Sequence, residues 1–465
     1  MLLAAIVAAA LTFAPLGAPV GTAVVAHAAH VAPNTRFDLV WHTGQAHWRV
    51  ENGKFLGIVA PDAARVVASG TSDADGALTL RFSVPEDFGY IHDVELRSAD
   101  AVVAHQGFTV IPHLTISPSS GPPGTPITVT MTGVGYRFYQ TVWHLMYDGA
   151  QTGWLSAITT HGTARVTLPA SGEPGMHTLQ AIEGPTAPYL NGQQSPNAQP
   201  LIPQVLAQTF RLVAGPPRLP ASAVAQAPQR ATEPPRRDAA GPSLATSFRS
   251  GTVGSPLVIT GHGFAPQASI AVDWETVVGN RLSGTGWETQ LRPFVRAVAD
   301  ANGDFTVRAQ TPDDLGGDHR VVAHPAGSDQ PQAAAAYRIV PSIAAIAPSS
   351  PTPGQTITLR LKGVGWTETA NTYTVVMDNA MFGYGCGFNS QGDVTIRVRA
   401  PGRAGWHFVD FYPTIYTGQI LGPGTPPNGA TVNGSYFLLP MLNVPDHPGE
   451  QLPAFHLAFF VRGSS

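Results

Sequence analysis

Cysteine and lysine are scarce in this chain. Its 465 residues include one cysteine, Cys386, and the only lysines are Lys54 and Lys362. One cysteine excludes an internal disulfide, and no paired Cys/His spacing typical of a structural zinc site occurs. We therefore expect the domains to be stabilised by their hydrophobic cores, without a cofactor.

Charge and long apolar runs are scarce as well. Charged residues make up 12 % of the chain, and the formal net charge is −4. This weak charge gives no general electrostatic reason to bind nucleic acid or an anionic membrane. The N-terminal apolar stretch is shorter than the roughly 20 residues that a transmembrane helix needs. We expect neither a nucleic-acid partner nor a transmembrane span.

Glycine and proline are abundant. The chain has 49 Gly and 43 Pro, about a fifth of all residues, together with 43 % hydrophobic residues. Such hydrophobicity is too high for a disordered chain. The composition predicts a turn-rich protein of three or four folded domains with few helices.

Internal repeats define the organisation of the chain. The segment LTISPSSGPPGTPITVTMTGVGY from Leu114 matches IAPSSPTPGQTITLRLKGVGW at one constant offset, which continues to the pair His177 and His407. A second pair, DADGALTLRFSVPEDFGYIHDV and DANGDFTVRAQTPDDLGGDHRV, keeps a constant offset of its own, with Asp87 matching Asp314. The repeats predict four units in the order A-B-A′-B′.

Alternating apolar runs such as ITVTMTG, TLRFSV and VTIRVRA occur in these units between Gly, Pro and Asp-Gly turns. Short alternating strands at this spacing are typical of β-sandwiches. The opening pattern P-x-x-G-x-x-G-x-x-(V/I)-x-(V/L)-x-x-x-G-x-G-(F/Y/W), followed by a strand with an aromatic residue such as Trp143 or Trp274, resembles the IPT/TIG family of immunoglobulin-like (Ig-like) domains. This resemblance implies disulfide-free sandwiches used as spacers or binding modules, usually outside bacterial cells.

The predicted fold is all-β, with four tandem Ig-like β-sandwiches. The predicted segments are a hydrophobic N-terminal segment (1–10), domain A (11–112), domain B (113–213), a Pro-rich linker (214–243), domain A′ (244–341), domain B′ (342–440) and a C-terminal tail with an extra strand (441–465).

The N-terminus has two interpretations. MLLAAIVAAALTFAP begins like a secretory signal, and Ala26-His27-Ala28 offers a cleavage site. However, LTFAPLGAPVGTAV from Leu11 matches LTISPSSGPPGTPI from Leu114, so cleavage after Ala28 would delete the first strand of domain A. We expect any cleavage near residues 8–10, with residues 1–10 a signal-peptide remnant; alternatively, residues 1–13 are an edge strand.

Two acidic motifs supply closely spaced oxygen ligands. The calcium candidates are Asp73, Asp75, Asp300 and Asp304. The motifs lack the Glu of a calcium loop, and Asp-Gly and Asn-Gly are preferred hairpin residues. We therefore favour turns over a metal site.

No catalytic residue is predicted. A G-x-S-x-G elbow is absent, and Cys386 has no partner placed by a recognisable motif. Histidines recur at equivalent places, His92 with His319 and His177 with His407. We expect each of them to bond a neighbouring loop at the start of a strand.

The B units carry long Pro/Gly-rich insertions before their last strands, where loops of this length are often functional. The predicted binding residues are Tyr189, Tyr416, Tyr384 and Trp154. Aromatic surfaces stack on sugars or pack against a protein, although the alternative is that most aromatics of B′ fill the core.

The tail HLAFFVRG forms a predicted strand that, if exposed, would pair with another chain. Together these features predict a non-enzymatic, extracellular or cell-surface structural or adhesive protein that self-associates through strand pairing or binds a protein partner. The alternative is a carbohydrate-binding accessory protein that uses the B-domain loops.

Overall fold

The computed structural model describes residues 9–137, 140–141, 143–184, 205–221, 241–279, 287–417 and 437–463. These residues form strands and two short 3-10 helices, η1 (Phe388–Ser390) and η2 (Val444–Asp446), with no α-helix among them. The chain divides into two compact units: unit 1 contains Met1–Arg218, Asn379–Met381 and Thr417–Gly449, and unit 2 contains Leu219–Asp378, Phe382–Tyr416 and Glu450–Ser465. The all-β fold is confirmed.

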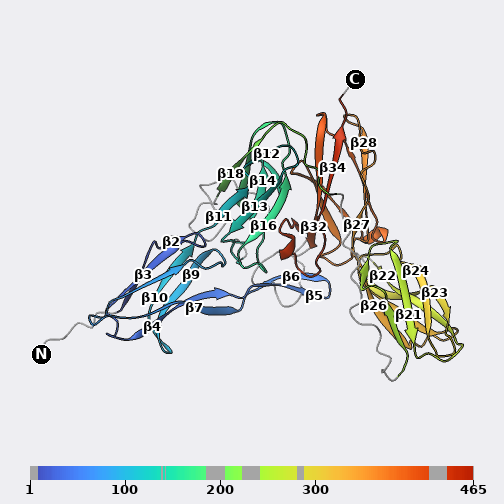
Figure 1. The fold of residues 1–465 in the computed structure, drawn as a ribbon, viewed down its shortest axis with the longest axis horizontal. Helices are drawn as coiled ribbons and strands as arrows, with labels where there is room; N and C mark the ends of the chain where they lie inside the picture. The colour runs from blue at the N-terminus through green and yellow to red at the C-terminus, as the bar shows by residue number, and fades with distance from the viewer. Residues whose placement is uncertain are drawn as a thin grey trace. The chain divides into compact units, whose positions relative to one another are not determined.

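Domain A, in unit 1, is a sandwich of two sheets with strand orders β1-β3-β8 and β2-β10-β9-β4-β7. It is blue in Figure 1. Its strands are β1 (Ala10–Ala14), β2 (Gly17–Ala18), β3 (Ala23–Ala29), β4 (Arg36–Gly44), β7 (Asp62–Thr71), β8 (Leu78–Ser83), β9 (Tyr90–Ser98) and β10 (Ala101–Val110).

Alternation of side chains builds the core of domain A. Along β8, Leu78, Leu80 and Phe82 are buried and the residues between them are exposed. This period of two sends alternate residues to opposite faces of the sheet. The buried side chains meet those of the other sheet, and Phe82 contacts Trp41 and Phe108 edge to face.

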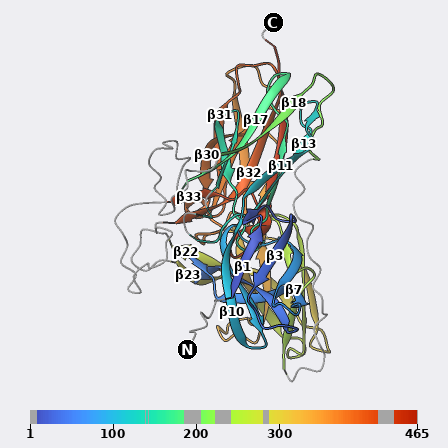
Figure 2. The same ribbon diagram turned by 90° about the vertical axis from the view of Figure 1, so that its left-hand side faces the viewer.

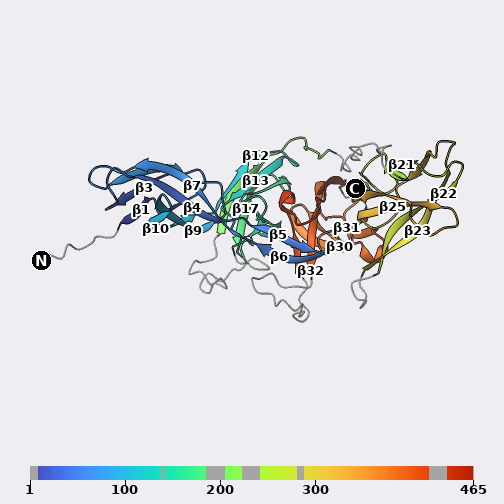
Figure 3. The same cartoon turned by 90° about the horizontal axis from the view of Figure 1, so that it is seen from below.

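The hairpin of β5 (His47–Glu51) and β6 (Lys54–Val59) forms a separate two-stranded sheet between β4 and β7. It extends away from the sandwich of domain A (Figure 3). Its Trp48 ring lies 5.9 Å from that of Trp154 in domain B, so the hairpin packs on domain B.

Domain B, also in unit 1, has the strand orders β11-β13-β16 and β12-β18-β17-β14-β15. Figure 2 shows β17 and β18 side by side, where they pair antiparallel. The strands are β11 (His113–Ser117), β12 (Ser120–Gly121), β13 (Pro126–Thr132), β14 (Trp143–Tyr147), β15 (Ala150–Trp154), β16 (Ala164–Pro169), β17 (Gly175–Glu183) and β18 (Val205–Leu212).

Domain A′, in unit 2, repeats this plan with the orders β19-β21-β24 and β20-β26-β25-β22-β23. Its strands are β19 (Ser243–Thr246), β20 (Ser250–Gly251), β21 (Pro256–His262), β22 (Ser269–Gly279), β23 (Trp287–Val298), β24 (Phe305–Gln310), β25 (Gly317–Pro325) and β26 (Ala333–Ile339).

Domain B′ contains the sheet β27-β28-β31 and a second sheet in which β30, β29 and β32 are neighbours and β34 pairs with β32. The first two residues of β30 belong to unit 1. The strands are β27 (Ser342–Ile343), β28 (Thr356–Lys362), β29 (Thr372–Met377), β30 (Ala380–Cys386), β31 (Val394–Arg399), β32 (Gly405–Thr417) and β34 (Phe455–Val461); β33 (Phe437–Pro440) lies in unit 1.

The predicted C-terminal strand exists as β34, but it is not an exposed edge. It pairs with β32 from Gly405↔Val461 to Phe411↔Phe455, as β18 pairs with β17 in domain B. On its other side, Phe460 N donates to Ser349 O at 3.3 Å. Because both sides are bonded, this strand is part of the B′ sandwich.

The N-terminal strand follows the repeat. Strand β1 pairs with β3 from Ala10↔Ala29 to Ala14↔Val25, and Leu11 and Phe13 are buried. Cleavage after Ala28 would remove β1 and most of β3. Residues 1–8 and most of the predicted linker, residues 222–240, lie outside the described residues. The residue limits of the four domains stay predictions.

Candidate functional site

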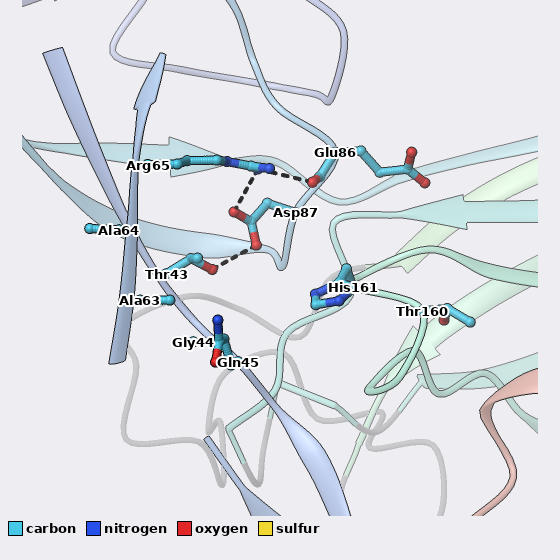
Figure 4. A pocket seen from close by; sticks show the side chains of 10 residues that line it. All are labelled: Thr43, Gly44, Gln45, Ala63, Ala64, Arg65, Glu86, Asp87, Thr160 and His161. Atoms are coloured by element: carbon cyan, nitrogen blue, oxygen red, sulfur yellow. Dashed lines mark hydrogen bonds and ion pairs between the residues drawn. The ribbon is translucent and has the colours of Figure 1, made fainter. Parts of the chain in front are cut away.

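An open cleft of about 610 Å³ lies in unit 1, where the ends of β4 and β7 and the loop at residues 86–87 of domain A meet a turn of domain B (Figure 4). Seven of its ten lining residues have polar or charged side chains. The lining residues are Thr43, Gly44, Gln45, Ala63, Ala64, Arg65, Glu86, Asp87, Thr160 and His161.

Asp87 is the buried centre of this site, with 2 % of its surface exposed. Its Oδ2 accepts from Trp41 Nε1 at 3.0 Å, and its Oδ1 accepts from Thr43 Oγ1 at 2.7 Å. Its Oδ1 also accepts from the main-chain N of Phe88 at 2.8 Å. These donors compensate the cost of burying the carboxylate.

Arg65 supplies the opposite charge. Its Nη2 donates to Asp87 Oδ2 at 3.0 Å and to the main-chain O of Glu86 at 3.1 Å (Figure 4). The side chain is 48 % exposed. Both of these bonds to described residues use one nitrogen, so the other N–H groups of this half-exposed guanidinium can reach a molecule in the cleft.

The same aspartate recurs in unit 2. Asp314 Oδ2 accepts from Trp274 Nε1 at 2.9 Å, and its Oδ1 accepts from Leu315 N at 2.8 Å. Here Gln391 Nε2 also donates to Asp314 Oδ1, at 2.5 Å. Gln391 and His161 have the same offset as His407 and His177, so they occupy equivalent positions of B′ and B.

The recurrent histidines bond neighbouring loops, as predicted. In domain A, His92 Nδ1 lies 2.8 Å from His42 O and Nε2 lies 2.8 Å from Phe88 O. His319 makes the equivalent contacts in domain A′. Each imidazole stacks on the indole that bonds the aspartate, with centroids 4.5 Å apart for Trp41–His92 and 4.7 Å apart for Trp274–His319.

In the B domains the histidines bond a turn aspartate. His177 Nδ1 lies 2.5 Å from Asp148 Oδ2, and His407 Nδ1 lies 2.5 Å from Asp378 Oδ2. Each Nε2 faces a carbonyl four residues earlier. Each pair connects a histidine on a strand, β17 or β32, to the turn that holds the aspartate, which is the geometry of a structural contact.

Glycine permits close contact between the domains of each unit. Gly89 N donates to Val134 O at 3.2 Å, and Gly316 N donates to Val364 O at 3.1 Å. A Cβ on Gly89 would lie 1.8 Å from Gly133 O, and one on Gly316 would lie 1.9 Å from Gly363 O. No side chain fits at either position without moving main-chain atoms.

Two of the predicted binding aromatics lie together. Tyr384, on β30, is 51 % exposed, and its ring centroid lies 5.8 Å from that of half-buried Tyr416. Phe382, two residues earlier on β30, is 57 % exposed. Tyr189 lies outside the described residues.

Trp154 is placed differently, because it has no exposed surface. Its Nε1 donates to Thr141 O at 2.9 Å, and its main-chain O accepts from Leu442 N at 3.0 Å. Burial by the 441–443 segment and by Trp48 prevents this residue from contacting a ligand in this structure. Phe411 and Tyr412 of B′ are buried as well, in agreement with core packing.

The acidic motifs form turns, as favoured from the sequence. Asp73 Oδ1 accepts from Asp75 N at 3.0 Å and Ala77 N at 2.8 Å, and Asp300 Oδ1 accepts from Asp304 N at 2.9 Å. The hairpin expected there is absent, because β7 and β8 belong to different sheets and the turn carries the chain between them. Among the described residues no group of three or more His, Cys, Asp or Glu could hold a metal ion.

Cys386 is a half-buried thiol, and its Sγ lies 2.9 Å from Thr372 Oγ1. In the described part of the chain, no helix is long and apolar enough to cross a membrane.

The sequence did not single out the cleft around Asp87. Asp87 and Asp314 were matched only as repeat positions, and the shared W-x-T pattern at Trp41 and Trp274 was the remaining signal. The register between β4 and β7 places Arg65 opposite Trp41, and this register could not be read from the sequence.

No family model matches the sequence, and a search of curated proteins also finds no match. The expected IPT/TIG membership is therefore not shown, whereas the Ig-like sandwich fold is.

Solved structures with similar folds include a Salmonella alpha-2-macroglobulin mutant (12 % identity, TM-score 0.19, 96 % of this chain and 30 % of that chain). Others are invasin, a bacterial integrin-binding protein (11 %, TM-score 0.16, 94 % and 79 %), and a putative membrane-anchored protein from Corynebacterium diphtheriae (9 %, TM-score 0.19, 98 % and 95 %). The chain thus spans 30 % of the macroglobulin chain. At these identities and TM-scores we take no function from them.

Proposed function

We propose that this chain is a non-enzymatic structural or adhesive protein of the cell exterior, in which each A–B pair is a stiff arm. The observation that supports this proposal is the duplicated domain junction. Domains joined in one chain move relative to each other unless their interface is tight. A main-chain hydrogen bond at a glycine that tolerates no Cβ makes both junctions tight.

Side chains strengthen each junction. In unit 1, Tyr90 Oη donates to Glu183 Oε1 at 2.5 Å, and Phe88 packs edge to face on Tyr136 at 4.9 Å. Burial, followed by the Glu183 charge, raises the pKa of Tyr90. In unit 2, Lys362 Nζ pairs with Asp313 and lies 3.2 Å from Asp393 Oδ1. A carrier of binding surfaces benefits from such stiffness because binding then loses less conformational entropy.

A non-enzymatic role agrees with the state of the buried polar groups. A general base needs an available lone pair near the substrate. The repeated histidines each have both ring nitrogens next to oxygen atoms.

The stiffness is measured by double electron–electron resonance between spin labels at Arg81→Cys on β8 and Thr167→Cys on β16, in a Cys386→Ser background. Both label sites are exposed. We expect one narrow distance distribution, which Gly89→Val broadens. A broad distribution in the protein without the glycine change would contradict the stiff-arm proposal.

Location and self-association are further parts of this proposal. Fractionation of the producing cells with an antibody against the chain should place it outside the cytoplasm. Because β34 is bonded on both sides, strand pairing between copies would use an edge strand such as β7 or β23. Sedimentation velocity that shows only monomer at all concentrations would remove self-association from the proposal.

A second candidate function, glycan binding, is favoured by the Tyr384–Tyr416 pair. Two neighbouring aromatic rings offer a surface on which sugar rings stack, because aromatic faces bind apolar C–H groups while the hydroxyls hydrogen-bond. A glycan array compares the protein with the double variant Tyr384→Ala, Tyr416→Ala and with Met176→Ala, an exposed apolar residue of domain B. Glycan binding that survives the double substitution would exclude these tyrosines.

A further inference from the structure

The two arms differ at one equivalent turn position. His161 and Gln391 stand at matching places of the repeat, with φ of 47° and 53°, and each precedes a glycine of positive φ. The φ angle is therefore similar at both positions, whereas the side chains differ.

The contacts of Gln391 show which groups surround a side chain at this position in unit 2. Its amide nitrogen donates to Asp314 Oδ1 at 2.5 Å and lies 3.3 Å from Thr276 Oγ1 and 3.4 Å from Val277 O. A carboxylate, a hydroxyl and a main-chain carbonyl thus surround one NH₂ group.

The same three acceptors exist in unit 1 as Asp87, Thr43 and the main chain of Gly44, and all three residues line the cleft. His161 does not take the place of the amide there. Its ring packs 5.8 Å from Phe88 at the side of the cleft, facing the Arg65–Asp87 pair (Figure 4). The cleft therefore contains the equivalents of the groups that Gln391 contacts in the other arm.

We propose that the cleft binds a primary carboxamide, such as the side chain of a glutamine in a peptide. The ligand NH₂ donates to Thr43 Oγ1 and Asp87 Oδ1, as Gln391 donates to their equivalents. The ligand carbonyl accepts from Arg65, whose bonds to described residues are made by Nη2.

The charges around the cleft select this group over similar ones. A carboxylate offers no donor to Asp87 and would lie beside two acidic residues, Glu86 and Asp87. An ammonium group offers no acceptor to Arg65. A volume of about 610 Å³ leaves room for the residues on either side of the amide.

Saturation-transfer NMR on the full chain tests this proposal with the peptide Ac-Gly-Gln-Gly-NHCH₃ and its control Ac-Gly-Glu-Gly-NHCH₃, whose capped ends carry only secondary amides. We expect the glutamine peptide to bind about tenfold or more tightly than the glutamate peptide, because the latter loses a hydrogen bond to a charged acceptor. Equal binding of the two peptides would overturn the proposal, and so would preferential binding of N,N′-diacetylchitobiose, which carries only secondary amides.

Substitutions at position 161 identify the site. His161→Gln should place a glutamine side chain on Asp87, as in unit 2, and reduce peptide binding about tenfold or more. His161→Gly leaves the cleft open, suits a positive φ and should keep binding within about threefold. His113→Gln, at an exposed histidine of β11, should change nothing. Unchanged binding by His161→Gln, or loss with His161→Gly, would show that peptide binds elsewhere or to the imidazole and would overturn the proposal; circular dichroism confirms that each variant is folded.

Discussion

The buried aspartates illustrate how single residues hold the arms together. Asp87 and Asp314 each connect a tryptophan of one strand to the loop that leads to the domain junction. Their charge is buried among hydrogen-bond donors. Loss of the carboxylate would leave those donors without an acceptor, and loss of the donors would leave a buried charge without compensation.

Replacing Asp87 by asparagine should therefore destabilise the protein. An amide NH₂ would face at least one of the donors Trp41, Thr43, Phe88 N and Arg65, and we expect a loss of about 3 kcal/mol in the free energy of unfolding. Denaturant titration followed by tryptophan fluorescence measures it. Asp75→Asn, at an exposed turn residue, should change stability by less than about 0.5 kcal/mol. A loss of similar size in both variants would contradict this account.

The buried His144 should make the stability of the folded protein depend on pH. Burial lowers its pKa from 6.5 to about 4, and Gln151 Nε2 donates to its Nδ1 at 3.0 Å, which requires the neutral ring. The unfolded chain binds the proton at the ordinary pKa. The stability that neutral His144 permits is therefore complete above pH 6.5 and is lost as the pH falls from 6.5 to 4, by up to about 3 kcal/mol.

Unfolding free energies at pH 7.5 and pH 4.5 measure this contribution as the difference between the parent and His144→Leu. The leucine variant should lose less stability on acidification, whereas His113→Leu, at an exposed position, should behave as the parent does. Equal acid sensitivity of the parent and His144→Leu would contradict the prediction.

Single residues were predictable from the sequence where duplication repeated their contacts. The four histidines recur because each bonds a loop of its own domain. Trp154 and Tyr384 stand at equivalent positions of B and B′, but the first is buried and the second is 51 % exposed. Leu442 and the hairpin residue Trp48 cover Trp154, and neither belongs to the repeat. Burial by distant segments cannot be inferred by comparing repeats.

At the scale of strands and turns, the glycines at the domain junctions give the sharpest test. Gly316→Ala places a Cβ 1.9 Å from Gly363 O, so the main chain must move and the Val364 hydrogen bond must lengthen. We expect destabilisation of about 2–4 kcal/mol, typical of overpacking and a lost buried hydrogen bond.

Gly402→Ala is the matched control, since a Cβ there meets nothing within 4 Å. It should leave stability within about 0.5 kcal/mol of the parent. Thermal unfolding of the two variants compares them, and equal melting temperatures would show that the junction relaxes without cost.

Strands were predictable because buried and exposed side chains alternate along them, which gives the sequence an apolar period of two, as in β8 and β16. The pairing of the strands was harder to predict. The Asp73 turn looked like a hairpin, because Asp-Gly suits positive φ in either setting, but it joins strands of different sheets. The strand β34 looked additional because a long insertion separates it from β32, although the two pair along seven residues.

At the scale of the whole molecule, contacts between distant segments complete unit 1. Asp446 accepts from Thr159 N at 2.6 Å and from Trp48 Nε1 at 3.2 Å, and Trp48 lies 398 residues earlier in the chain. Burial raises the pKa of Asp446. These bonds hold residues 441–447 against domain B and the β5–β6 hairpin.

Trp48→Phe keeps the aromatic ring and removes the donor. We expect amide hydrogen exchange in residues 441–447 to increase about tenfold, the effect of losing roughly one hydrogen bond to this segment. Tyr136→Phe, which removes a hydroxyl at the A–B junction, should leave exchange in the segment unchanged. Unchanged exchange in Trp48→Phe would assign the docking to apolar contacts alone.

The junctions between A and B units have a consequence for how such chains grow. Each junction depends on main-chain oxygens and on a hydrogen atom where a Cβ would be, so one glycine on the A side carries much of its geometry. An A–B pair can therefore be duplicated as one unit. Its surface residues can then change while the angle between its two domains stays the same. The difference between His161 and Gln391 is such a change. In unit 2 the Gln391 side chain occupies the position beside Asp314, whereas in unit 1 the equivalent position beside Asp87 stays open to a ligand.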